Sequence, residues 1–552
     1  MKQFLLAGAC AWAVLALGAP AGAADIDPAK IADHVKILAS DAFEGRGPAT
    51  AGEVKTVQYL TDQFKAAGLQ PGGDLQKDGA RAWTQDVPLA QFDNKDPIKV
   101  SVTVNGQVQT WAQGEQIAIR APQTGVDHVS VKDAPVVFVG YGVKAPERNW
   151  DDFKGVDLKG KIALVLVNDP DFETGQGDFG GKAMTYYGRW TYKYEEAARQ
   201  GAVGFIVIHE TAPASYGWNT VKNSNTNTVF DIIRADPTKA HAPIEAWIQR
   251  DPAVELFKAS GLDFEALKKQ AQTRDFKPVT LKGVTFSTDI AVDAKKIVSK
   301  NVAGLLPGTK HPEDKVIYTA HWDHLGVGLP DAKGDRIYNG ALDNASGTSV
   351  LIEMARAAAA QPRTERSMLF LAVTAEEKGL LGSEYYAANP LYPLATTVAD
   401  INMDGASVNG PSRDFGTSGD APLTLQDDLI EVAKGYHMTY SPDPRPGAGS
   451  FFRSDHFSFA KRGVPAISFG GGQDLVNGGK ARGEALQKAY TTDKYHQPAD
   501  EYSADWDLTG AAQNAEMLLD LGTRLANSRE WPEWKAGSEF KAERDKTASA
   551  RK

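Results

Sequence analysis

The chain has 552 residues, a formal net charge of −10, 42% hydrophobic residues and 24% charged residues. At roughly 150 residues per domain, this length and ordinary composition predict a globular protein with more than one folded unit. The acidic balance argues against nucleic acid as the main partner, because phosphate binding needs a basic surface.

Residues 1–23 combine an early lysine, an apolar stretch and the run Ala21-Gly22-Ala23, which is typical of a signal-peptidase site. A membrane anchor is the alternative, but the small residues and the cleavage pattern favour a signal peptide that is removed. No other segment approaches the roughly 18 apolar residues of a spanning helix, so we expect no stable membrane insertion after cleavage. The single cysteine, Cys10, lies in this segment. A cysteine-free exported chain favours a bacterial periplasmic or extracellular location.

Residues 30–70 carry apolar side chains at helical spacing, and residues 95–120 alternate as half-buried strands do. We assign residues 24–129 to the N-terminal part of a catalytic domain. After this point short apolar runs such as APVVFVGYGV, KIALVLV and GAVGFIVI predict buried strands, with TYKYEEAARQ as a helix before the last run. We therefore expect residues 130–285 to form a separate inserted unit.

A longer alternation of strands and helices follows in residues 286–530. Examples are the strands VIYTAH, SMLFLAVT and TVADINM and the helix SGTSVLIEMARAAAA. This pattern predicts an α/β catalytic domain with a mixed, largely parallel sheet flanked by helices. The polar residues 531–552 predict a loose tail.

Ionisable residues follow the ends of the predicted strands or lie in the loops beside them: His321, Asp323, Asp343, Glu376, Glu377, Asp404 and His496. Open α/β sheets bind ligands at the carboxyl ends of their strands. Imidazole and carboxylate groups suit zinc, which binds them at about 2.0–2.2 Å and keeps a position open for water in catalytic sites. The set could serve two ions if one carboxylate bridges them, and a further carboxylate would then act as a base.

Five strings resemble, in order and spacing, the secreted co-catalytic zinc aminopeptidases, a superfamily that includes glutamate carboxypeptidase II and the transferrin-receptor ectodomain. They are HWD (321–323), GALDNASG (340–347), TAEEKGLLGSEYY (374–386), NMDG (402–405) and YHQPADEY (495–502). In addition, the inserted unit resembles the protease-associated domain of many members, and ILASDAFEGRGPATAGE resembles their N-terminal helix and loop.

The resemblance implies two zinc ions per chain. His321, Asp343 and Asp404 would hold one ion. Asp343, Glu377 and His496 would hold the other, with Asp343 as the bridge.

The resemblance also implies roles beside the metals. Glu376 would be the general base, and Asp323 would accept the N–H of His321 and fix its tautomer. His456 is a candidate oxyanion or substrate contact, whereas His324 is expected to be a bystander.

The implied activity is that of an exported metallo-exopeptidase acting on peptides with a free N-terminus. A carboxypeptidase of the glutamate type stays open, because Arg445, Arg453 and Arg462 could bind a substrate carboxylate. A metal-free binding protein, as the transferrin receptor is, would show lost ligands, and the strings retain all of them. GYGVKA at 140–145 is not followed by a helix, which argues against a dinucleotide site.

Overall fold

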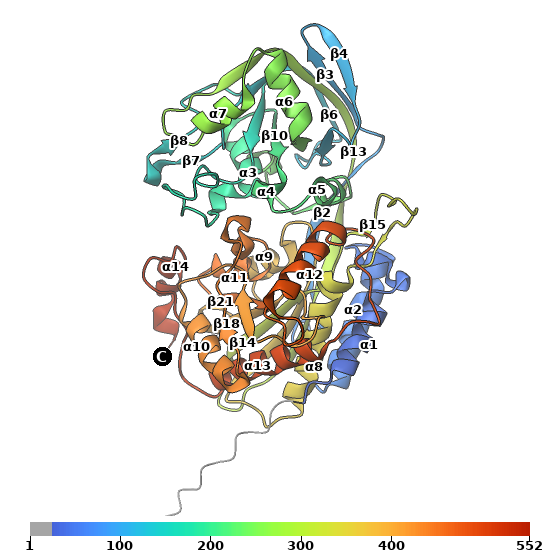
Figure 1. The fold of residues 1–552 in the computed structure, drawn as a ribbon. Coiled ribbons are helices and arrows are strands. Elements are labelled where there is room, and N and C mark those ends of the chain that lie inside the picture. The colour runs from blue at the N-terminus through green and yellow to red at the C-terminus, as the bar shows by residue number, and fades with distance from the viewer. Residues whose placement is uncertain (1–24, 552) are drawn as a thin grey trace, which may run out of the picture.

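One long strand, β13 (Val279–Leu306), runs through both units of the molecule (Figure 1). The computed structural model describes residues 25–551, so the expected signal peptide lies outside the described residues. The first half of β13 belongs to the sheet of the upper unit and the second half to the sheet of the lower unit. Each unit has its own buried hydrophobic core. Within residues 25–551, none of the helices combines the length and apolar character needed to cross a bilayer.

The lower unit is built on a mixed sheet whose centre is parallel. In spatial order the parallel strands are β17 (Arg366–Val373), β14 (His311–His321), β18 (Thr397–Met403) and β21 (Ala466–Gly471). On one side, β13 pairs antiparallel with β17 and is followed by β2 (Thr84–Asn94). On the other side, β19 (Asp414–Thr417) pairs antiparallel with β21 and parallel with β20 (Thr439–Tyr440).

Helices pack on this sheet through apolar stripes. The helix α8 (Gly347–Ala359) lies against β14 and contacts α1 (Pro28–Leu38) and α13 (Thr509–Ala526). The short helix α11 (His456–Ala460) packs on β18 and β21 and against α9 (Leu381–Ala388). The remaining helices of this unit are α2 (Ala51–Ala66), α10 (Thr424–Ala433), α12 (Gly479–Asp493) and α14 (Lys541–Asp545). The predicted α/β fold with a largely parallel, helix-flanked sheet is confirmed.

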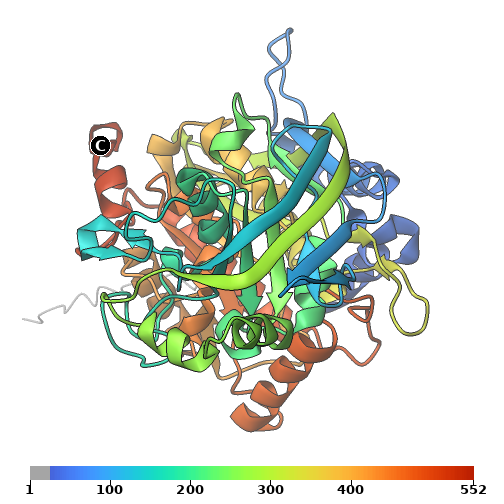
Figure 2. The ribbon, with the colours of Figure 1, turned by 90° about the horizontal axis from the view of Figure 1, so that it is seen from above.

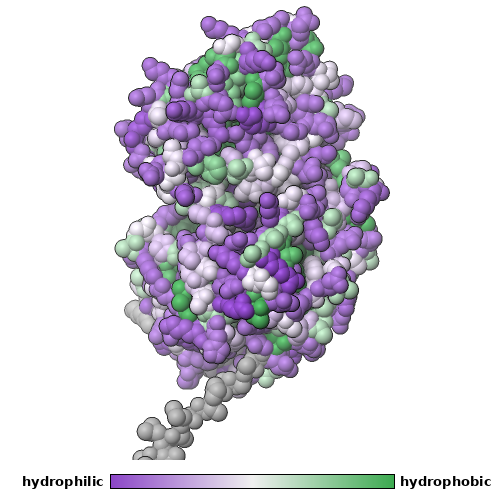
Figure 3. Space-filling view, viewed as in Figure 1, coloured by the Kyte–Doolittle hydropathy of each residue, from purple (hydrophilic) through white to green (hydrophobic). Residues whose placement is uncertain are grey.

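The upper unit holds a second sheet, in which β13 lies beside the antiparallel β6, as Figure 2 shows from above. Parallel strands continue from β6: β6 (His128–Phe138), β9 (Ile162–Leu166), β10 (Gly204–His209) and β12 (Ile244–Gln249). Its helices are α3 (Trp190–Gln200), α4 (Thr211–Ala214), α5 (Trp218–Asn225), α6 (Arg250–Ala259) and α7 (Phe264–Gln270). Hydrophilic residues cover most of the face of the molecule seen in Figure 3.

The boundary of the upper unit differs from the predicted one at residue 130. The strands β3 (Lys99–Val104), β4 (Gln107–Trp111) and β5 (Ile117–Ile119) were expected in the catalytic part. Instead β3 pairs with β13 and β4, and β5 pairs with β12, all in the upper sheet. The alternation of apolar residues predicts strands here, but it does not identify their pairing partners.

The C-terminal segment is not a loose tail. Trp534 is 1% exposed, and its indole N–H donates to the carbonyl of Gly463 at 3.0 Å. Arg544 is equally buried and donates to the carbonyl of Thr397 at 3.1 Å. A few apolar and planar side chains therefore anchor a segment whose average composition is polar.

Candidate metal centre

The predicted ligands converge at the carboxyl ends of the parallel strands. His321 is the last residue of β14, Asp404 directly follows β18, and Glu376 follows β17 after a two-residue gap. Asp343 lies in the turn that leads into α8, and its peptide bond to Asn344 is cis.

Asp343 lies between two groups of potential ligands. His321 Nε2 is 3.1 Å from Asp404 Oδ1 and 3.3 Å from Asp343 Oδ1. His496 Nε2 is 3.0 Å from Glu377 Oε2 and 3.2 Å from Asp343 Oδ2. Each carboxylate oxygen of Asp343 therefore faces a different histidine.

These separations fit zinc ligation. Two ligand atoms about 2.1 Å from one ion, at a tetrahedral angle, lie about 3.4 Å apart. The four distances of 3.0–3.3 Å are close to this value. Mixed imidazole and carboxylate donors also match the preference of zinc. The residues present thus fit two zinc ions that share Asp343.

Burial and mutual charge set the protonation of this cluster. Burial alone would lower the pKa of His496, but Glu377 and Asp343 outweigh it and raise the pKa to about 10. Burial would raise the pKa of Glu377, and Asp343 adds to this, yet His496 and His324 lower it to about 2. Without an ion the imidazoles hold protons, so a metal ion must displace them when it binds.

Glu376 is the carboxylate next to both groups. Burial raises its pKa well above the usual value, and the negative charges of Asp404 and Glu377 add to this although His321 opposes it. A carboxylate beside a metal group is the type of side chain that can accept a proton from a water molecule and return it to a leaving group.

Asp323 contacts its neighbours differently from what the resemblance implied. His321 Nδ1 is 3.1 Å from the backbone carbonyl of Asp323 and 3.8 Å from its carboxylate. The carboxylate instead accepts the backbone N–H of Glu376 at 3.0 Å and that of Glu377 at 3.4 Å. The carbonyl therefore orients the imidazole, while the side chain positions the glutamate turn.

The expectation that His324 is a bystander is wrong on geometry. Its side chain is fully buried, and its Nδ1 lies 2.6 Å from Glu377 Oε1. The ligand atoms of His324, Asp343 and Glu377 lie within 4.8 Å of one another, which is close enough to hold a metal ion. The sequence feature that could have indicated this role is the position of His324, three residues after His321 at the end of the same strand.

His456 is not placed as a substrate contact. It is fully buried, its ring lies 4.8 Å from that of Phe451, and it is absent from the lining of the cavity described below. Burial lowers its pKa to about 3, so the imidazole is neutral. We therefore assign it no contact with substrate.

Arg46, from the EGRG turn, braces the loops that carry the ligands. Its buried guanidinium donates to the carbonyls of Trp322, Leu38, Asn339 and Gly340 at 2.7–2.8 Å. The sequence resemblance pointed to this loop but gave Arg46 no role.

Asp500, in the YHQPADEY segment, also holds a ligand-bearing loop in place. Its carboxylate accepts the backbone N–H of Leu342 and of Asp343, each at 3.0 Å. The bridging carboxylate is thus held from the segment that also supplies His496.

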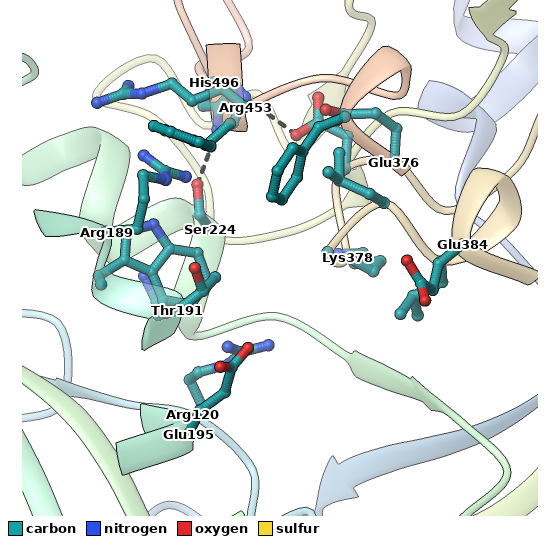
Figure 4. A pocket seen from close by; sticks show the side chains of 18 of the residues that line it. Arg120, Arg189, Thr191, Glu195, Ser224, Glu376, Lys378, Glu384, Arg453 and His496 are labelled. Carbon is teal, nitrogen blue, oxygen red and sulfur yellow. Dashed lines mark hydrogen bonds and ion pairs between the residues drawn. The ribbon is translucent and has the colours of Figure 1, made fainter. Parts of the chain in front are cut away.

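A cavity of about 410 Å³ lies between the two units beside this centre (Figure 4). Its charged lining comes from both units: Glu376, Glu377, Lys378, Glu384, Arg453, Lys461 and His496 from the lower one, and Arg120, Arg189, Glu195 and Arg234 from the upper one. The upper unit also contacts one of the predicted metal-ligating residues, because Ser224 Oγ on α5 is 2.7 Å from His496 Nδ1. Ser224 was not among the site residues predicted from the sequence.

The sequence matches known families in both units. The pattern of peptidase family M28 matches residues 301–521, and that of the PA domain matches residues 131–240. Aminopeptidase YwaD of Bacillus subtilis is 36% identical over 450 residues, which cover 79% of this chain and 75% of that protein. A glutamate carboxypeptidase 2 homolog of Caenorhabditis elegans is 23% identical over 389 residues, covering 62% of this chain and 46% of that protein.

Solved structures agree on the fold. An aminopeptidase from Aneurinibacillus sp. strain AM-1 superimposes with a TM-score of 0.53 at 19% identity, covering 91% of this chain and 94% of that one. The superposition covers both the lower unit and the insert, in agreement with the two sequence matches. The chain belongs to peptidase family M28 and is a metallopeptidase that carries an inserted PA domain.

Proposed function

We propose that this metallopeptidase is an exported aminopeptidase that uses two zinc ions to remove N-terminal residues from peptides. The observation that carries the proposal is the placement of Asp343, whose two oxygens face His321 and His496 at 3.3 and 3.2 Å. The names of the relatives, among them aminopeptidases from Bacillus subtilis and yeast, support the same activity.

The metal ions would supply an activated water and polarise the scissile carbonyl. The chain's own part begins with Glu376, which accepts the proton of the attacking water and later returns it to the leaving amine. The Asp323 carboxylate holds the backbone of Glu376 in place for this transfer. Ser224 and the Asp323 carbonyl each fix the Nδ1 side of a histidine, which leaves both Nε2 atoms directed at the carboxylates.

The PA domain forms the wall of the cavity opposite the glutamates. A cavity of about 410 Å³ bordered by both units favours short or unfolded peptide substrates over folded chains. The free α-amine of a substrate would bind near the acidic groups of the centre.

The proposed location is the periplasm or the extracellular medium of a bacterium. It rests on residues 1–23, whose charge, apolar stretch and Ala21-Gly22-Ala23 run suit an export signal.

A carboxypeptidase of the glutamate type is the second candidate. The specific observation in its favour is Arg453, which lines the cavity and could bind a substrate carboxylate. A panel of peptides with free or acetylated N-termini separates the two activities. An aminopeptidase cleaves only the free-amine peptides and releases their first residue, whereas a carboxypeptidase tolerates acetylation and releases the last.

Zinc content tests the metal part of the proposal. Elemental analysis of the purified, zinc-loaded protein should give close to two ions per chain. If the protein takes up no zinc, the proposed hydrolysis is ruled out and the alternative of a metal-free binding protein is favoured.

A further inference from the structure

His496 adopts a backbone conformation that most residues with a side chain avoid. It is the third residue of a turn in which the Gln497 N–H donates to the Lys494 carbonyl at 2.9 Å, and its φ is +55°. Glycine takes this left-handed conformation at no steric cost, whereas a residue with a side chain is strained there. Such a conformation persists where neighbouring groups fix it. A predicted zinc ligand in this state therefore needs support from outside its own turn.

That support comes from the PA domain. Asn223 of α5 donates from Nδ2 to the His496 carbonyl at 2.9 Å. No backbone N–H within residues 25–551 donates to this carbonyl. The next residue of α5, Ser224, lies 2.7 Å from the imidazole Nδ1 (Figure 4). Two successive residues of one helix thus hold the backbone and the ring of the same predicted zinc ligand.

The helix α5 is anchored in its own domain. Val221 is 2% exposed and belongs to a hydrophobic core of the PA domain. The indole N–H of Trp218 donates to the carbonyl of Gly114 at 2.9 Å. A movement of the PA domain away from the lower unit would therefore carry α5 away from His496.

Other contacts join the two units without involving the predicted zinc ligands. Asn168 of the PA domain donates from Nδ2 to the Gly447 carbonyl at 2.9 Å. The backbone N–H of Met184, in the same domain, donates to the Pro446 carbonyl at 3.0 Å. These contacts can keep the units together when zinc is removed, so the effect of zinc on α5 can be measured separately.

We infer that Asn223 is a positioning residue of the metal centre and that it couples zinc binding by Glu377 and His496 to the docking of the PA domain. The inference rests on the proposed two-zinc aminopeptidase. In this role Asn223 acts through His496, whose Nε2 it helps to keep 3.0 Å from Glu377 Oε2. The coupling is reciprocal: if a docked α5 favours zinc binding, bound zinc favours a docked α5 by the same factor.

The first test compares zinc affinity in the full-length wild type and in Asn223→Leu. Leucine is similar in size but has no donor, so the His496 carbonyl loses its partner. Residues that hold metal ligands in place typically contribute about 10–100-fold to affinity. In competition with a chromogenic chelator, the variant should therefore give up one of its two zinc ions about tenfold more readily than the wild type, while the other ion stays bound.

Asn225→Leu is the matched control for Asn223→Leu. Asn225 lies on the same helix and is buried to a similar degree, with 7% of the residue exposed against 8% for Asn223. Its Nδ2 donates to the carbonyl of Val221 within α5. The control should hold both ions as the wild type does. Wild-type affinity in Asn223→Leu, or an equal loss in both variants, overturns the inference.

The reciprocal effect provides a second measurement that needs no variant. Hydrogen exchange is followed in the zinc-loaded wild type and in the same protein after a chelator has removed the zinc. The amides of α5 should exchange faster in the metal-free protein. Those of α6, which lies at the far end of the PA domain in Figure 1, should exchange at the same rate in both states. Equal exchange of α5 in both states overturns the coupling, even if Asn223→Leu does not fold.

The proposed activity and this inference fail on different measurements. A zinc-loaded wild type that cleaves no free-amine peptide refutes the aminopeptidase, whereas zinc affinity and hydrogen exchange still decide the role of Asn223. If the wild type binds fewer than two zinc ions, both are refuted.

Discussion

His324 Nδ1 lies 2.6 Å from Glu377 Oε1, and both side chains are shielded from solvent. The distance is that of a hydrogen bond, although neither atom has a well-aligned partner among residues 25–551. The contact holds one oxygen of Glu377 while the other oxygen faces His496 at 3.0 Å.

Replacing His324 should weaken zinc binding at the group formed by Glu377 and His496. Residues that hold metal ligands in place typically contribute about 10–100-fold to affinity. We expect His324→Asn to release one of two zinc ions at chelator concentrations that leave the wild type fully loaded. Competition with a chromogenic chelator measures this.

His128→Gln is the control for His324→Asn, because His128 lies on the surface with half of its side chain exposed. It should retain both ions. Wild-type affinity in His324→Asn, with normal folding, would show that the contact does not support the metal group.

Glu376→Gln should keep zinc and lose turnover. The amide preserves the size of the side chain but cannot accept a proton, and general-base contributions are about 10²–10⁴-fold in rate. Parallel measurements of kcat and zinc content test this. Glu255→Gln, at an exposed position of the PA domain, should change neither. A fully active Glu376→Gln would assign the base elsewhere.

Ser224→Ala tests whether the PA domain helps to orient a metal ligand. Ser224 Oγ is 2.7 Å from His496 Nδ1 across the boundary between the units. Its removal frees the imidazole to rotate, so we expect zinc affinity to fall by about tenfold. Titration of the metal-free protein with zinc measures the change.

Ser260→Ala provides the comparison, since the Ser260 hydroxyl donates to the carbonyl of Leu256 within the PA domain. Equal zinc affinity in both serine variants would mean that the Ser224 contact does not orient His496.

The sequence was most informative where structure is local. Apolar runs predicted β14, β17 and β18 and therefore the sheet edge at which His321, Glu376 and Asp404 meet. The strings around Asp343 and His496 placed the remaining groups at this edge.

Long-range relations could not be read in the same way. The strands β3 to β5 alternate like any half-buried strands, and only their partners assign them to the upper sheet. Ser224 and Arg189 line the cavity beside the metal centre because the upper unit packs next to the lower one. No local sequence pattern predicts this contact between the units. The helix α5 was missed because its Asn and Ser residues have low helix propensity, which packing of the buried Val221 overrides.

Arg46→Lys should destabilise the lower unit. Lysine replaces a fixed fork of donors by one rotating ammonium, so some of the four buried carbonyls would lose their partner. Each unsatisfied buried group costs about 1–3 kcal/mol. Equilibrium unfolding in denaturant should show a loss in this range or above, whereas Arg274→Lys on the surface should stay within about 0.5 kcal/mol. A matching loss in both variants would contradict the bracing role.

His241 should make the stability of the PA domain depend on pH. Its Nδ1 lies 2.9 Å from Glu245 and its Nε2 lies 3.0 Å from Asp231. Burial alone would lower the pKa of His241, but these two carboxylates raise it to about 9 in the folded chain, against 6.5 for the free side chain. Because the folded state binds this proton more tightly, the stabilisation is fully present below pH 6.5 and is lost as pH rises through about 9.

A shift of this size corresponds to about 3 kcal/mol of unfolding free energy. His241→Gln should therefore be less stable than the wild type at pH 6, and the difference should shrink by pH 9.5. Urea unfolding at both values, with the zinc content kept equal, measures it. His437→Asn, at an exposed position, should show no such trend. A difference that is constant from pH 6 to pH 9.5 would mean that His241 stabilises by packing, because only the charged imidazole can lose its attraction to Asp231 and Glu245 over that range.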